Sequence, residues 1–151
     1  MNMVDDRISE FHRLHSSGCF VMPNPWDGGS ARALEQMGFK ALATTSAGLA
    51  WTLGRADSQV TLEQTLAHLR VVVDAVKVPV NADFEGCYAV DPQQIGANVK
   101  LAADTGIAGL SIEDSSGNEA DPLFEFDLAV ERVRAARQAI DETGTGIVLT
   151  G

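Results

Sequence analysis

Residues 78–114, VPVNADFEGCYAVDPQQIGANVKLAADTGIAGLSIED, decide the fold that the sequence predicts. A short apolar strand over residues 78–83 leads to a helix that Asp91 caps and that begins at Pro92. A second apolar strand, residues 108–112, follows this helix. Strand, amphipathic helix and strand in this order are typical of a parallel sheet covered by helices.

The same alternation extends in both directions from this segment. Thr61 and Gln64 predict a capping box, and a loop is expected from Thr45 to Val60. The helix expected after Pro122 carries a predicted apolar stripe of Phe126, Val130, Val133 and Ile140, which reaches the surface at Arg137. Further strands are predicted at residues 19–22, 40–44 and 146–150, and further helices at residues 5–15, from Asp27 or Ser30 to Met37, and 61–76.

Five strands separated by helices place the chain in the α/β class. Two architectures fit this order: an open doubly wound sheet, or the beginning of a (β/α)8 TIM barrel, which needs about 250 residues when complete. No helix follows the strand at residues 146–150. We therefore expect residues 1–151 to form a partial TIM-barrel domain, present as about the first half, strands one to five.

Composition excludes several classes of partner. The net charge is −10 and the isoelectric point is about 4.5, so we expect no nucleic acid and no membrane as a partner. Cys19 and Cys87 have no spacing typical of a disulfide framework or a zinc site. The N-terminal residues are charged and lack the apolar segment of a signal peptide. A cytoplasmic location fits these features.

Acidic and amide side chains gather where the predicted strands end. Asn81 and Asp83 lie two residues apart on one strand and therefore point the same way, and Glu113 ends the next strand. Their oxygens are ligands suited to Mg²⁺. The alternative is that Asp83 and Glu113 cap helices or pair with buried arginines.

Small and hydroxyl side chains follow the strand at residues 40–44. Thr45, Ser46 and Ala47 allow backbone N–H groups to approach an anion, although such residues also make ordinary tight turns. Trp26 lies in a loop after another predicted strand, where it either lines a pocket or packs. The three histidines, His12, His15 and His68, fall on helices and are interpreted as surface residues.

Four segments in this order resemble the isocitrate lyase/phosphoenolpyruvate mutase superfamily. They are PNPWDGGSARALEQMGFKALATTSAGLA (23–50), LGRAD (53–57), VPVNADFEGCYA (78–89) and GLSIEDS (109–115). The resemblance implies a Mg²⁺ ion near Asp83 and Glu113, with Asn81 beside them, and a small 2-oxo- or 2-hydroxy-carboxylate as substrate. It implies that residues 1–151 are a partial phosphoenolpyruvate-binding TIM-barrel domain. It also implies cleavage or formation of a C–C or P–C bond through a pyruvate-enolate-like species.

The resemblance also assigns residues to the substrate. Thr45, Ser46 and Ala47 match the segment that binds the substrate carboxylate, and Asp57 matches an acid close to metal and substrate. We therefore expect Asp57 and Thr45 to be catalytic, and Trp26 to contribute to substrate binding.

Three departures from the family pattern bear on the reaction. Asn81 stands where the family has the first aspartate of a DxD pair. The KxCGH segment of isocitrate and methylisocitrate lyases is replaced by residues 114–119, DSSGNE, so the chain is not expected to be either lyase. The family's arginine after strand five would follow Gly151.

Two other functions are consistent with parts of the sequence. A catalytically inactive half-barrel that self-associates through its open strand edge is the main alternative, and a homo-oligomer is expected in either case. A phosphoacceptor receiver domain would need an acidic pair after the first strand and a lysine after the fifth. The chain instead has Asn24, Pro25, Trp26 and Asp27 after the first strand, and no such lysine.

Overall fold

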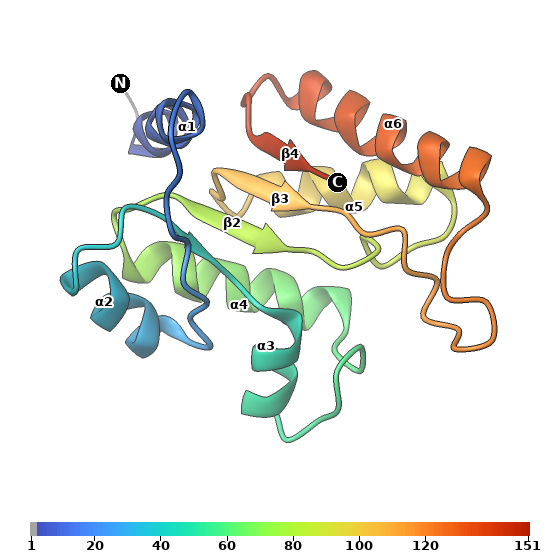
Figure 1. The fold of residues 1–151 in the computed structure, drawn as a ribbon, viewed down its shortest axis with the longest axis horizontal. Helices are drawn as coiled ribbons and strands as arrows, with labels where there is room; N and C mark the ends of the chain where they lie inside the picture. The colour runs from blue at the N-terminus through green and yellow to red at the C-terminus, as the bar shows by residue number, and fades with distance from the viewer. Residues whose placement is uncertain (1–2) are drawn as a thin grey trace.

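The computed structural model describes residues 3–151 and contains a four-stranded parallel sheet in the order β1-β2-β3-β4 (Figure 1). Each neighbouring pair of strands is parallel, and Asp83 of β2 stands opposite Ser111 of β3, which stands opposite Thr150 of β4. The predicted α/β class is confirmed. The strands are β1 (Leu42–Ala43), β2 (Val80–Asp83), β3 (Gly109–Ser111) and β4 (Val148–Thr150).

Helices connect the consecutive strands and pack against the sheet. Helix α4 contacts β2, and α6 packs along α5 (Figure 1). None of the helices described between residues 3 and 151 is both long and apolar enough to cross a bilayer. The helices are α1 (Met3–His15), α2 (Gly28–Gln36), α3 (Ser46–Thr52), α4 (Leu62–Ala75), α5 (Pro92–Ala103) and α6 (Phe126–Thr143).

Short-range capping signals set where three of the helices begin. Asp27 caps α2 and forms a capping box with Ser30. Thr61 and Gln64 form the capping box of α4, as predicted, and Asp91 caps α5, whose first residue is a proline. Because a cap satisfies the free N–H groups of a first turn, these starts follow from the sequence alone.

Alternate strand residues face the helices and form the core. Val80 and Ala82 of β2 and Leu110 of β3 are almost fully buried. The helical side chains that pack in the same buried cluster include Leu66, Leu69, Val73, Ile95, Val99, Ala136 and Ile140. The other face of these strands carries Asn81, Asp83, Gly109 and Ser111, because side chains alternate along a strand.

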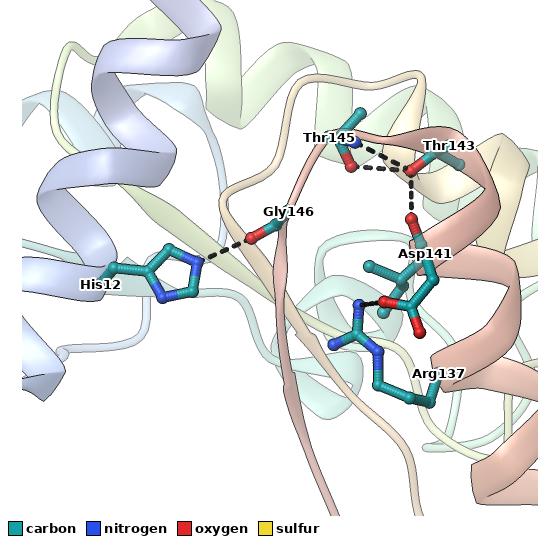
Figure 2. A network of polar contacts seen from close by, with 7 residues as sticks. His12, Arg137, Asp141, Thr143, Thr145 and Gly146 are labelled. Carbon is teal, nitrogen blue, oxygen red and sulfur yellow. Dashed lines mark hydrogen bonds and ion pairs between the residues drawn. The ribbon is translucent and has the colours of Figure 1, made fainter.

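Helix α1 covers the end of the sheet where the strands begin. Its Phe11 is 1% exposed and lies against Gly109, where an added Cβ atom would come 2.6 Å from the phenyl ring. The Arg7 guanidinium donates to the carbonyl of Val76 at 2.7 Å. His12 Nε2 lies 2.7 Å from the carbonyl oxygen of Gly146, just before β4 (Figure 2). This end of the sheet is therefore filled by side chains.

Two predicted features of the N-terminal half are wrong. Residues 19–22 form no strand, and Val21 is 65% exposed. The neighbouring β1 contributes the bond from the Ala43 N–H to the carbonyl of Pro23 at 3.2 Å, and prolines 23 and 25 have no N–H to donate. The loop expected from Thr45 to Val60 instead contains the short helix α3.

The predicted apolar stripe of α6 is also wrong in part. Phe126 and Val133 are 76% and 39% exposed, and the helix buries Arg132, Ala136, Ala139 and Ile140 instead. The buried face is therefore rotated away from the largest apolar side chains. Arg132 is accepted in the interior because distant backbone carbonyls receive its N–H groups.

Candidate active site

The ends of β1 and β2 are joined by hydrogen bonds that involve Asp83. The Ser46 N–H, in the first turn of α3, donates to Asp83 Oδ2 at 2.7 Å. The Asp83 N–H in turn donates to Thr44 Oγ1 at 2.9 Å. The predicted carboxylate-binding segment and the predicted metal-binding aspartate thus lie side by side, with the Ser46 amide aimed at an anionic group.

Trp26 and Thr45 pack around Gly48 beside this junction. Thr45 caps α3 by accepting the Gly48 N–H at 3.2 Å. A Cβ atom at Gly48 would lie 2.7 Å from the Trp26 ring, so this approach requires glycine. Trp26 is 44% exposed and makes an edge contact with Trp51, with ring centroids 5.4 Å apart. Trp26 therefore forms part of the rim at the finishing end of the strands.

Acidic side chains follow β2 and β3 and influence each other. Partial burial raises the pKa of Glu85; the hydrogen bond from the Tyr88 hydroxyl at 2.9 Å opposes this, and the charges of Asp83, Asp57 and Glu113 raise it further. Partial burial also raises the pKa of Glu113, followed by the charges of Asp83, Asp57 and Asp114. The sequence placed Asp57 in an exposed loop, and the fold brings it within electrostatic reach of both glutamates.

The donors at this end fit Mg²⁺ held in part through water. Within residues 3–151, no three His, Cys, Asp or Glu side chains are arranged to bind one ion directly. All the candidate donors are oxygens, and Mg²⁺ in proteins keeps several waters and uses one or two carboxylates. Asn81 is 7% exposed, and its Oδ1 is buried without a hydrogen-bond partner. Asn81 and Asp83 point to the same face of β2, and Asn81 lies two residues nearer the beginning of the strand, on the side of α1.

Comparison with known proteins identifies the family. The model for phosphoenolpyruvate phosphomutase matches residues 11–151. This chain belongs to the phosphoenolpyruvate phosphomutase family. The resemblance inferred from the four sequence segments is therefore confirmed.

Solved structures of phosphoenolpyruvate phosphomutase relatives share the fold. A candidate lyase/mutase from Burkholderia cenocepacia J2315 is 38% identical, with a TM-score of 0.95, over 98% of this chain and 54% of that one. A 2,3-dimethylmalate lyase of the PEP mutase/isocitrate lyase superfamily is 29% identical, with a TM-score of 0.85, over 99% and 52%. An oxaloacetate acetylhydrolase is 26% identical, with a TM-score of 0.84, over 95% and 51%.

A relative found by sequence comparison also matches this chain over only about half of its own length. An uncharacterized protein of Mycobacterium tuberculosis (strain H37Rv) is 35% identical over 129 residues, which are 85% of this chain and 48% of the relative. The chain thus spans about half the length of the relatives that it matches, and its sheet has the barrel-type α/β fold of this family.

A side pocket opens next to the acids and was not foreseen from the sequence. It has a volume of about 310 Å³ and lies between the turn after β2 and the loop after β3. Its lining residues include Glu85 and Glu113, together with Ser58, Tyr88, Ser115, Phe124 and Arg132. The sequence places Glu85 just after a strand. The pocket beside it could not be predicted, because its walls come from loops that are distant in the chain.

Arg132 is the residue of this region that no sequence pattern singles out. It lies in α6, far along the chain from the turn after β2, and an arginine at this spacing is usually exposed. Family membership does not by itself assign it a role.

Proposed function

We propose that this phosphoenolpyruvate phosphomutase family protein belongs to a Mg²⁺-dependent enzyme that cleaves a C–C or P–C bond in a small 2-oxo- or 2-hydroxy-carboxylate, such as oxaloacetate or phosphonopyruvate. The observation that carries the proposal is the group of acids at the ends of β2 and β3 beside the N–H groups of α3. Relatives named as a 2,3-dimethylmalate lyase and an oxaloacetate acetylhydrolase support this reaction class.

Asp83 and Glu113 are the proposed Mg²⁺-binding residues, with Asn81 as a further oxygen donor. Partial burial raises the pKa of Glu113, and the charges of Asp83, Asp57 and Asp114 raise it further; a divalent cation would relieve this charge repulsion. The chemistry supplied by Mg²⁺ at such a site is stabilisation of negative charge on a substrate oxygen in a pyruvate-enolate-like intermediate.

Thr45, Ser46 and Ala47 are proposed to receive the substrate carboxylate. In support, the Ser46 N–H already donates to a carboxylate, that of Asp83. The Thr45 hydroxyl and the Asp57 carboxylate are the proposed catalytic groups. Thr45 adjoins Ser46, whose N–H reaches Asp83, and the charge of Asp57 acts on Glu85 and Glu113. Trp26 would shield one side of the substrate from water.

Turnover of oxaloacetate and phosphonopyruvate tests this proposal. The expected result is Mg²⁺-dependent conversion by a lyase, mutase or hydrolase reaction, followed by NMR. The products would be pyruvate or phosphoenolpyruvate from phosphonopyruvate, and pyruvate or oxalate plus acetate from oxaloacetate. Asp83→Asn removes the charge with little change of shape, and we expect it to lower kcat/KM at least about a hundredfold.

Glu131→Gln is the matched control, because Glu131 is an exposed carboxylate of α6. It should leave turnover unchanged. If neither substrate is converted with Mg²⁺ by this chain or by a longer chain that contains it, the proposed reaction is wrong. Equal activity of wild type and Asp83→Asn would instead reject the metal-binding role of Asp83.

Self-association also stays a prediction. A groove of about 560 Å³ runs beside the end of β4 and is lined by apolar side chains of α6, among them Phe126, Val130 and Val133. Contact between such faces of two copies would remove apolar surface from water. Light scattering after size-exclusion chromatography measures it, and a monomer at all concentrations would contradict it.

A further inference from the structure

The Arg132 guanidinium is buried and held by carbonyl groups of one turn. Arg132 is 1% exposed. Its Nη1 donates to the carbonyls of Ala89 at 2.6 Å and Val90 at 3.2 Å, and its Nη2 donates to the carbonyl of Gly86 at 2.9 Å. The ion pairs found within residues 3–151 do not include Arg132. This charge is therefore compensated by the backbone of the turn after β2.

The flat face of the same guanidinium contacts the second loop of the side pocket. Its central carbon lies 3.8 Å from the centre of the Phe124 ring, which is a favourable cation–π geometry. Phe124 belongs to the loop after β3, which is closed on itself by the bond from the Phe124 N–H to the carbonyl of Asp114 at 2.9 Å. One side chain of α6 thus connects both loops.

The turn that Arg132 holds has a strained backbone. Glu85, Cys87 and Tyr88 have φ angles of 48°, 58° and 56°, in the left-handed region that non-glycine residues seldom adopt. Such residues carry backbone strain and persist only when their surroundings fix them. The buried Asn98 of α5 adds one such contact, because its Nδ2 donates to the carbonyl of Cys87 at 2.8 Å.

The strained turn also determines where an acidic side chain points. Glu85 enters the pocket from this turn, and the Glu113 N–H donates to the Glu85 carbonyl at 3.0 Å. There is no spare room at the contact, since a Cβ atom on Gly86 would lie 3.0 Å from Arg132 Nη2. A shift of the guanidinium would therefore move the pocket wall.

We propose that Arg132 is a positioning residue that fixes the two loops of the side pocket, and that this pocket receives the part of the substrate distal to the carboxylate bound near Ser46. The proposal rests on the proposed function for its substrate class. The loops that line the pocket follow β2 and β3, whereas α3 follows β1, on the other side of β2 in the sheet. A substrate whose carboxylate is bound near Ser46 would reach the pocket by extending along this edge of the sheet, past Asp83.

Arginine suits this role better than lysine does. A guanidinium offers several N–H donors in one plane and a face for stacking, whereas an ammonium is a compact point charge. Arg132→Lys should keep the charge but lose the contact with Phe124 and some of the carbonyl contacts. Arg132→Met should lose all of them at similar volume.

Two ligands of different length test the proposal. Oxalate has no group distal to the bound carboxylate, and 3,3-difluorooxaloacetate has one. An oxaloacetate acetylhydrolase binds both molecules. We would measure their affinities calorimetrically with Mg²⁺ present. Both Arg132 variants should bind difluorooxaloacetate about tenfold more weakly or worse, and oxalate within about twofold of wild type. Arg134→Met, an exposed arginine of the same helix, is the control and should change neither.

Labelling of Cys87 reports on the turn without any ligand. Cys87 is fully buried in the turn, and burial raises the pKa of its thiol to about 12. In a Cys19→Ser background, which removes the exposed thiol, the Arg132 variants should label faster with a thiol reagent than wild type and Arg134→Met. Phe124→Leu removes the stacking contact with Arg132 and no hydrogen bond. If the Arg132 variants do not fold, this variant replaces them in the test and should also label faster than wild type.

The possible outcomes separate the two proposals. If the Arg132 variants bind both ligands equally more weakly than wild type, or bind both as tightly as wild type, the pocket does not receive the distal part of the substrate. Unchanged Cys87 labelling in a folded Arg132 variant would overturn the positioning role. If wild type binds neither ligand, the proposed function fails, and Cys87 labelling still decides whether Arg132 fixes the turn.

Discussion

The two ends of the sheet are built in opposite ways. Where the strands begin, α1 fills the space with Phe11, which packs against Gly109. Where the strands finish, carboxylates stand near one another beside an open pocket, and the turn after β2 is strained. Charge repulsion and backbone strain oppose folding, whereas buried apolar contacts favour it. The difference indicates that one end of the sheet provides stability, and it fits the proposal that the other end is the active site.

The largest effect on stability is expected at the beginning of the strands. Phe11→Ala removes a fully buried ring and should lower the free energy of unfolding by about 3–5 kcal/mol, measured by urea denaturation. Phe126→Ala is the matched control, since Phe126 is 76% exposed, and should change it by less than about 0.5 kcal/mol. Similar losses for the two variants would mean that α1 does not anchor this end.

A smaller effect, which depends on pH, is expected at the finishing end. Glu85 and Glu113 have pKa values above the ordinary 4.5. An acid whose pKa is raised by folding stabilises the protein below its unfolded value, and this contribution is lost as the pH rises through the raised pKa. The free energy of unfolding should therefore fall as the pH rises above about 4.5, by about 1 kcal/mol or less because both groups remain partly solvated.

The double variant Glu85→Gln/Glu113→Gln isolates this contribution. Its stability should depend less on pH than that of wild type between pH 4 and pH 8, and it should be at least as stable at neutral pH, while Glu131→Gln should follow wild type. Parallel pH profiles of the double variant and wild type would show that folding does not raise the pKa values of these two acids.

The smallest effect is expected for the ion pair near the end of α6. Arg137 Nη2 and Asp141 Oδ1 lie 2.7 Å apart, and both side chains are substantially exposed (Figure 2). Asp141→Asn should change the melting temperature by less than about 2 °C, because exposed pairs at this spacing contribute only about 0.3–0.5 kcal/mol. A larger loss would reveal that the beginning of β4 depends on this pair.

The sequence predicted best what depends on neighbours in the chain. The caps formed by Thr61 and by Asp91 involve residues three positions apart, so their pattern is visible without a fold. Helix α3 was missed because it has only seven residues and contains Gly48, and its start depends on Thr45 and on the packing of Trp26.

The sequence was enough to predict which acidic residues lie at the candidate site, but not how the surrounding loops are arranged. Asp83 and Glu113 could be placed at strand ends because parallel strands finish at one edge. The approach of Asp57, the side pocket and the burial of Arg132 each require loops that are distant in the chain to meet. A buried arginine is compatible with α6 only because the turn after β2 offers its carbonyls. No local periodicity carries that information.

The contact between Trp26 and Trp51 also has an optical consequence. These are the two tryptophans of the chain, and both are partly exposed at the rim of the finishing end. The intrinsic ultraviolet emission of the protein therefore arises almost entirely from one corner of the molecule. A ligand that settles near α3 would alter that emission directly, so the protein carries its own fluorophore for titrating its candidate active site.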